Sequence, residues 1–317
     1  MITYKPFALC PGDTIRVVSP ASPIEPNETE AGIALLEQAG FRVEVGDHAF
    51  DRTGYFAGAD ADRADDLMRA FLDPKVNAVI CSRGGYGCPR LIPRLDLHAM
   101  ARSGKMFLGF SDITTIHVAL NKAGLATLYS PMVGSFSTPR ADWVKQSFLN
   151  ALAGADPFDV DYPPGTCLVP GVAEGLSAGG CLVPFMDSLA TPHEIETDGC
   201  VLIIEDVGEK PHRVDALFTH LIRSGKIQRC AGIVIGEMTG TDDMIPRNEA
   251  GEPIEGYRNV TWRTIVTERI RPLGIPTVID FPVGHIPNML TVPLGVRVRI
   301  DAEAGTMNLR EPICQEQ

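Results

Sequence analysis

A serine stands between an apolar run and a helical pattern in the first half of the sequence. Met106–Phe110 predicts a strand, and Asp112–Ala123 predicts a helix closed by a glycine. A serine hydroxyl becomes a nucleophile when it is exposed and has a base and oxyanion donors nearby. The turn would expose Ser111 beside the free N–H groups of a helix N-terminus. A serine that only caps the helix fits as well, because Ile113 replaces the last glycine of the G-x-S-x-G turn.

A glycine-rich loop, Arg83–Gly87, follows the predicted strand Val76–Cys81. Successive glycines let backbone N–H groups converge on a small anion, so the loop suits half of an oxyanion hole or a phosphate site. It matches neither G-x-G-x-x-G nor G-x-x-x-x-G-K-[ST]. The alternative is a tight turn that only needs glycine for its positive φ angles.

A general base has to lie on an ordered loop beside a strand end. Of the seven histidines, His285 fits best, because it follows the predicted strand Thr277–Phe281 and stands between Gly284 and Pro287. On local grounds, an ordinary surface histidine is the alternative. The base also needs an acidic partner to orient it and to stabilise its charge.

Glu205 is the best candidate for that partner. Four apolar residues, Val201–Ile204, run into Glu205 and Asp206, which places a carboxylate at the end of a buried strand. Because side chains alternate along a strand, we expect only one of the two acids to face the site. Two solvated acids at a strand end are the alternative.

The elements that must position these residues indicate two α/β domains. Strands alternate with helices over residues 1–154, which predicts a mostly parallel sheet, and Thr138–Ala153 predicts its last helix. Residues 155–171 are rich in proline and predict a linker. Residues 172–317 predict a mixed α/β domain that ends in an antiparallel hairpin from Val296 to Leu309. We therefore expect the serine, glutamate and histidine to straddle the domain interface.

Composition excludes several functions. The net charge of −12 argues against nucleic acid and anionic membranes as partners. No long apolar run or signal-peptide pattern is present, so we expect a cytoplasmic protein without a membrane span. The eight cysteines form no C-x-x-C pair and suit buried thiols rather than disulfides or zinc. We expect neither a metal nor another cofactor.

Together with their flanks, these motifs resemble the LD-carboxypeptidase family of serine peptidases, which includes the microcin C self-immunity peptidases. The matching stretches are Pro11–Thr14, Tyr55–Gly58, Arg83–Gly87, Gly109–Asp112, Ile204–Val207 and Gly284–His285. The resemblance implies that Ser111 attacks, that His285 acts as base and then acid, and that Glu205 orients His285. It also implies that the backbone N–H groups of Gly85 and Asp112 hold the oxyanion.

The resemblance further implies hydrolysis of the bond between an L-centre and a terminal D-amino acid. The usual substrate is a small peptide, the murein tetrapeptide, which loses D-alanine during cell-wall recycling in the cytoplasm. A homodimer without metal is implied as well.

The sequence departs from the family pattern at four places. Cys181 stands for asparagine in one stretch and Ala190 for glycine in a second. In Tyr129–Met132, Tyr129 and Ser130 stand for histidine and glycine. The fourth stretch has tyrosine, isoleucine and arginine in the family pattern where this sequence has His212, Val214 and Ala216. Two other functions therefore stay open: a microcin C immunity-type peptidase or amidase, and a non-catalytic protein that binds an anion at the glycine-rich loop.

Overall fold

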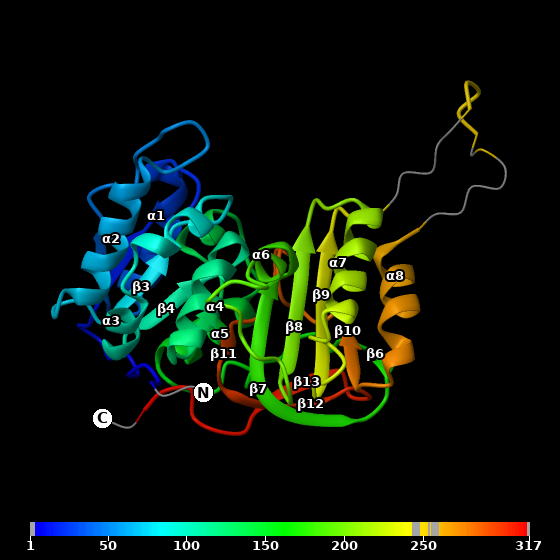
Figure 1. The fold of residues 1–317 in the computed structure, drawn as a ribbon. Coiled ribbons are helices and arrows are strands. Elements are labelled where there is room, and N and C mark those ends of the chain that lie inside the picture. The colour runs from blue at the N-terminus through cyan, green and yellow to red at the C-terminus, as the bar shows by residue number, and fades with distance from the viewer. Residues whose placement is uncertain (1–3, 243–247, 253, 255–259, 316–317) are drawn as a thin grey trace.

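The computed structural model describes residues 4–242, 248–252, 254 and 260–315. Two β-sheets lie side by side, and helices pack against each of them (Figure 1). Within the described residues, no helix has both the length and the apolar character needed to cross a membrane. Six of the eight cysteines are buried, whereas Cys10 and Cys167 are exposed.

The first sheet has six strands in the order β11-β5-β4-β3-β1-β2. All neighbours are parallel except β11, which runs antiparallel to β5. The inner strands are short apolar runs that are buried along their whole length, as expected for a parallel sheet covered on both faces. The strands are β1 (Thr14–Val18), β2 (Arg42–Val45), β3 (Ala78–Cys81), β4 (Met106–Gly109), β5 (Thr127–Tyr129) and β11 (Val292–Leu294).

Five α-helices connect or follow the strands of the first sheet. Their buried faces pack on the two sides of the sheet and complete its two hydrophobic clusters. Short 3-10 turns occur at residues 88–90, 92–94, 111–113 and 133–137. The helices are α1 (Pro26–Gln38), α2 (Asp60–Leu72), α3 (Leu97–Arg102), α4 (Thr114–Ala123) and α5 (Asp142–Leu152).

The second sheet has seven strands in the order β13-β12-β7-β8-β9-β10-β6. The four strands from β7 to β10 are parallel, and the outer pairs are antiparallel. The strands are β6 (Thr166–Val169), β7 (Val172–Cys181), β8 (Val201–Val207), β9 (Gly232–Thr239), β10 (Thr277–Ile279), β12 (Arg297–Asp301) and β13 (Thr306–Leu309).

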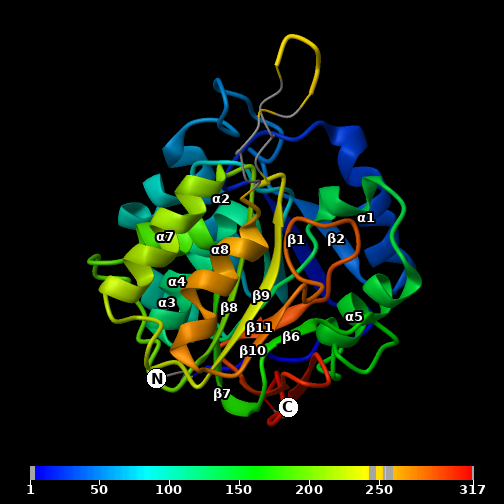
Figure 2. The same cartoon turned by 90° about the vertical axis from the view of Figure 1, so that its right-hand side faces the viewer.

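Among the described residues, three α-helices belong to the second sheet: α6 (Leu182–Asp187), α7 (Pro211–Arg223) and α8 (Trp262–Arg269). A 3-10 turn follows at Arg271–Leu273. Figure 2 shows α7 and α8 together on one side of this sheet. The apolar stripe of α7 packs there into a cluster with β8 and β9. The predicted fold class is confirmed, including the mostly parallel first sheet and the C-terminal antiparallel hairpin.

Three local predictions differ from the structure or fall outside it. The sequence predicts Thr138 and Pro139 as the N-cap and first turn of the helix, but α5 begins at Asp142. Thr138 is extended at φ −117° and ψ 150°, as an N-cap would be, but the residue that caps α5 is Ala141, which has φ −59° and ψ 150°. The range predicted as a linker contains β6, which pairs with β10. Residues 242–257 are polar and contain glycine and proline, a pattern that predicts an exposed loop, and they lie largely outside the described residues.

The chain crosses between the two sheets close to its C-terminal end. β10 belongs to the second sheet and β11 to the first, so the loop between them spans the junction. Arg140 of the first half donates to the Pro287 carbonyl, and the backbone N–H of Ala141 donates to Asn288 Oδ1 at 2.8 Å. These contacts hold the loop that carries His285 against the first sheet.

Candidate active site

Ser111 occupies a strained turn between β4 and α4. Its φ of 68° lies in the left-handed region, which a serine rarely adopts, and its side chain is half-buried. Gly109 permits the tight turn, because a Cβ there would stand 2.9 Å from the Ile113 side chain. The strand, the turn and the short helical segment at Ser111–Ile113 match the geometry that exposes a nucleophile at the end of a parallel strand.

His285 lies opposite Ser111 on the loop that joins the two sheets. Its Nε2 is 2.9 Å from Ser111 Oγ, and its Nδ1 is 2.7 Å from Glu205 Oε2. The ring of Phe110 packs against the imidazole with centroids 5.0 Å apart. The structure therefore brings Ser111, His285 and Glu205 into one hydrogen-bonded chain, although they are far apart in the sequence.

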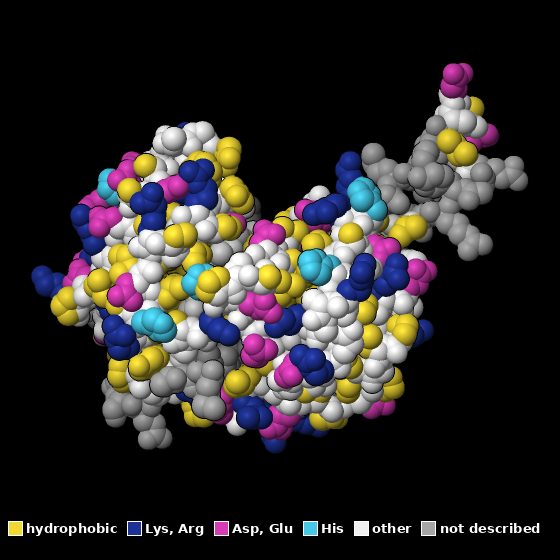
Figure 3. All heavy atoms as spheres, viewed as in Figure 1, with side chains coloured by type: hydrophobic (Ala, Val, Ile, Leu, Met, Phe, Trp, Pro, Cys, Tyr) yellow, Lys and Arg dark blue, Asp and Glu magenta, His cyan; other side chains and the backbone are white. Residues whose placement is uncertain are grey.

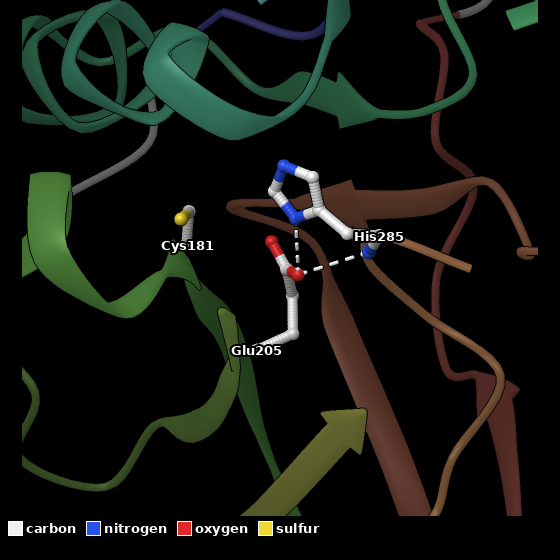
Figure 4. A group of neighbouring side chains, drawn as sticks. All are labelled: Cys181, Glu205 and His285. Atoms are coloured by element: carbon white, nitrogen blue, oxygen red, sulfur yellow. Dashed lines mark hydrogen bonds and ion pairs between the residues drawn. The ribbon is translucent and has the colours of Figure 1, made fainter. Parts of the chain in front are cut away.

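Glu205 is fully buried, lies among the last three residues of β8 and faces His285, as Figure 4 shows. Its Oε2 accepts hydrogen bonds from both the Nδ1–H and the backbone N–H of His285, the latter at 3.0 Å. Burial opposes protonation of His285, but the charge and hydrogen bond of Glu205 outweigh it, so the pKa of His285 is raised above its ordinary value. This pairing favours an imidazole that accepts a proton at Nε2.

Asp206 has a different environment. Its Oδ2 accepts the backbone N–H of Val183 at 2.9 Å, and burial raises its pKa to about 6. Only one of the two strand-end acids therefore contacts His285, in agreement with the alternation of side chains along a strand.

Tyr129 is a site residue that the sequence reasoning missed. It ends β5 and is wholly buried, and its hydroxyl donates a hydrogen bond to Glu205 Oε1. The same hydroxyl accepts the backbone N–H of Ser111 at 3.3 Å. The available signal was that Tyr129 stands where the family pattern has histidine. Nothing in the sequence shows that this position contacts a carboxylate from another sheet.

The glycine-rich loop lies directly against Ser111. A Cβ at Gly84 would stand 2.7 Å from the Cβ and 2.9 Å from the Oγ of Ser111, so only glycine permits this approach. The Asp112 carboxylate accepts the backbone N–H of Cys88 at 2.8 Å and ties the loop to the Ser111 turn. Over the described ranges, the backbone N–H groups of Gly85 and Asp112 donate to no protein acceptor. Both groups are available to a ligand.

A pocket of about 470 Å³ opens beside Ser111. It contains one cation, Arg83, and one carboxylate, Glu28, among mainly small and apolar side chains. Figure 3 shows the molecular surface hollowed between the two halves. The lining residues are Ile24, Glu28, Ser82, Arg83, Gly84, Gly85, Phe110, Ser111, Met132, Gly134, Ser135, Val207 and His285.

Cys181, Glu205 and His285 place potential metal-ligand atoms within 4.8 Å of one another, and Figure 4 shows the sulfur of Cys181 beside the glutamate and histidine. Sequence spacing could not reveal this group, because tertiary packing assembles it. A cysteine binds a metal as the thiolate, but burial raises the pKa of the Cys181 thiol far above its usual range. Both oxygens of Glu205 already accept hydrogen bonds. These side chains favour a protonated thiol beside a Glu–His pair.

Two family models match the chain. The LD-carboxypeptidase N-terminal domain matches residues 15–130, and the LD-carboxypeptidase C-terminal domain matches residues 174–300. A Bacillus subtilis protein named probable murein peptide carboxypeptidase is 32% identical over 96% of this chain and 94% of its own length. The murein tetrapeptide carboxypeptidase of Pseudomonas aeruginosa is 30% identical over 86% of this chain and 87% of its own length.

The fold has solved relatives. The muramoyltetrapeptide carboxypeptidase from Oxalobacter formigenes has a TM-score of 0.78 and 27% identity, over 93% of this chain and 97% of that chain. A microcin C7 self-immunity protein in its apo state has a TM-score of 0.84 over 99% of this chain and 100% of that chain. At 21% identity, this similarity shows the fold alone. The family models and the named relatives together support a carboxypeptidase function. From these matches, the chain belongs to the LD-carboxypeptidase family.

Proposed function

We propose that the protein is a serine carboxypeptidase that hydrolyses the bond between an L-centre and a terminal D-amino acid. Its substrate is the murein tetrapeptide, from which it releases D-alanine. The observation that carries the proposal is the hydrogen-bonded chain of Ser111, His285 and Glu205 beside an open pocket. The names of the relatives from Pseudomonas aeruginosa and Oxalobacter formigenes support this substrate.

In the proposed mechanism, His285 Nε2 takes the proton of Ser111 as Oγ attacks the scissile carbonyl carbon. The backbone N–H groups of Gly85 and Asp112 stabilise the oxyanion of the tetrahedral intermediate. His285 then gives the proton to the leaving amine of the D-amino acid. Water, activated by the same imidazole, hydrolyses the acyl-enzyme, and Glu205 stabilises the imidazolium in both steps.

Arg83 supports an exopeptidase rather than an endopeptidase reaction. A carboxypeptidase has to recognise the terminal carboxylate, and a guanidinium is the group best suited to bind a carboxylate in two hydrogen bonds. Arg83 lines the pocket that contains Ser111, and its guanidinium donates a hydrogen bond to the Pro23 carbonyl at 3.4 Å. We assign Arg83 to the substrate's terminal carboxylate.

A microcin immunity-type activity is the second candidate. The microcin C7 self-immunity protein of Escherichia coli is 25% identical over 98% of this chain and 98% of its own length. Four stretches of the sequence also differ from the family pattern, and two of the differing residues, Cys181 and Tyr129, lie beside Glu205. A substrate panel that contains murein tetrapeptide and an aminoacyl sulfamoyl adenosine separates the two activities.

The direct test is incubation of the protein with murein tetrapeptide, followed by mass analysis. We expect a product that lacks one alanine, and no reaction with the diastereomer that ends in L-alanine. Ser111→Ala is the control and should leave the peptide intact. Binding without cleavage by the wild type would instead favour the non-catalytic anion-binding protein.

The location and assembly follow from the same proposal. Recycling of murein peptides places the enzyme in the cytoplasm, and the family resemblance suggests a homodimer. Sedimentation velocity should give a mass of about twice the 34.2 kDa chain. A single species at the monomer mass over the micromolar range would reject the dimer.

A further inference from the structure

One hydroxyl connects the nucleophile's turn with the acid that partners the base. Tyr129 belongs to the first sheet and Glu205 to the second, so their hydrogen bond crosses the junction between the sheets. The same oxygen accepts the backbone N–H of Ser111 at 3.3 Å. Tyr129 thereby fastens the strained turn, with its φ of 68°, to the carboxylate that serves His285.

The two oxygens of Glu205 have separate partners. His285 donates to Oε2 twice, whereas the Tyr129 hydroxyl donates to Oε1. Because Glu205 is fully buried, an Oε1 without a donor would be poorly solvated. Burial, reinforced by the charge of Glu205, raises the pKa of the Tyr129 hydroxyl far above its ordinary value, so the hydroxyl remains a donor.

We propose that Tyr129 is a positioning residue. Its hydroxyl fixes Glu205 in the orientation that accepts the hydrogen bonds of His285, and it holds the Ser111 turn in place relative to that carboxylate. The proposal rests on the catalytic roles given above to Ser111, Glu205 and His285. Tyr129 does not touch the reacting atoms and acts through these residues.

This role has a chemical signature. A hydrogen bond donated to a carboxylate stabilises its charged form and lowers the proton affinity of the Glu205–His285 pair. Removal of the donor raises that affinity, so the imidazole is protonated at a higher pH. A residue that only filled space would leave the affinity of the pair unchanged.

The test is Tyr129→Phe, which keeps the ring and its packing against Phe110 and His117 but removes the hydroxyl. The readout is the rate at which a fluorophosphonate labels Ser111 as a function of pH. We expect the acid limb, which is the part of the pH profile where labelling slows as His285 is protonated, to move upward by about 0.5–1 pH unit. Labelling at a pH below the inflection should then slow about 3- to 10-fold. Tyr162→Phe is the matched control, because its hydroxyl accepts the backbone N–H of Met307 at 3.2 Å and the acid limb should stay in place.

A slower Tyr129→Phe enzyme with an unmoved acid limb would overturn the proposal and leave only a packing role. If this variant does not fold, the proposal can still be tested by replacing the six tyrosines with 3-fluorotyrosine. The fluorinated phenol is a stronger donor, so the acid limb should then move downward. An unmoved limb in the fluorinated protein would likewise reject the proposal.

Labelling of Ser111 needs no knowledge of the substrate. The proposed substrate and the proposed role of Tyr129 can therefore be rejected independently of each other. A wild type that is labelled at Ser111 but does not cleave murein tetrapeptide rejects the substrate and leaves the role of Tyr129 intact. A wild type that cleaves the tetrapeptide, with an acid limb that Tyr129→Phe does not move, rejects only the positioning role.

Discussion

Glu205 and His285 are joined by two hydrogen bonds that end on the same carboxylate oxygen. Oε2 accepts the side-chain Nδ1–H at 2.7 Å and the backbone N–H of His285 at 3.0 Å. The carboxylate therefore fixes both the ring and the loop that carries it. This arrangement leaves Nε2 directed at Ser111 Oγ, 2.9 Å away.

The first prediction concerns pH. The proposed mechanism needs neutral His285, and the pKa of this residue is raised above 6.5, so kcat/KM should fall as pH drops through an inflection above 6.5. In Glu205→Gln, the charge that raises this pKa is lost while burial still lowers it. The inflection should then move below 6.5, and the rate should drop by about 10⁴. A profile without an acid limb down to about pH 4.5 would exclude a histidine base.

The same pKa shift has a consequence for stability. Because the folded-state pKa lies above the unfolded value, the protonated pair stabilises the fold below pH 6.5. This contribution is lost as pH rises through the folded-state pKa. Urea denaturation of wild type and Glu205→Gln at several pH values measures it. Because the folded-state pKa of His285 in Glu205→Gln should lie below 6.5, this variant should instead lose stability as pH falls below 6.5.

The second prediction concerns Gly284. Its φ is 103°, and a Cβ there would overlap the carboxylate of Glu205. We expect Gly284→Ala to displace the Glu205–His285 pair and to lower kcat/KM by about 10²-fold or more, since a misplacement of 1 Å has an effect of that size.

The matched control is Gly274→Ala, which has a φ of 69° and no heavy atom within 4 Å of the added Cβ. It should lower the free energy of unfolding by about 1 kcal/mol and leave kcat/KM unchanged. Equal losses of activity in both variants would show that backbone strain, rather than the overlap with Glu205, is responsible.

The third prediction separates the chemistry of Ser111 from its strain. Ser111→Ala and Ser111→Gly should both fold and lose about 10⁶ in kcat. Glycine adopts a φ of 68° without strain, although it has more freedom in the unfolded chain. Ser111→Gly should therefore be more stable than Ser111→Ala by about 0.5–1 kcal/mol in urea denaturation. The reverse order would contradict a strained turn at this residue.

The fourth prediction concerns Arg83. Arg83→Met should raise KM and lower kcat/KM about 10–100-fold for a peptide with a free terminal carboxylate, because a hydrogen bond to a charged group contributes about 1.5–3 kcal/mol. For the same peptide with an amidated terminus, wild type and variant should react equally slowly. Arg83→Lys keeps the charge and should recover part of the loss. An unchanged preference for the free acid in Arg83→Met would remove Arg83 from the carboxylate site.

The sequence alone determined the features that depend on local pattern. Apolar runs that alternate with helical periodicity predicted two α/β sheets, and the turn after β4 placed Ser111 at a strand end. The same logic placed Glu205 at the end of a buried strand, although β8 continues for two further residues to Val207. The motifs also carried the family resemblance, which the two domain matches bear out. The domain limits at 154 and 172 stay predictions, and β11 shows that the chain of the second half enters the first sheet.

Only the tertiary structure decided which side chains meet. The choice of Glu205 over Asp206 depends on which side of β8 faces the junction, and the position of His285 depends on a loop that crosses between sheets. Tyr129 and Cys181 come beside Glu205 through contacts between strands that are distant in the sequence. Local propensities carry no information about such contacts, because they form only when the two sheets pack and bury their polar groups together.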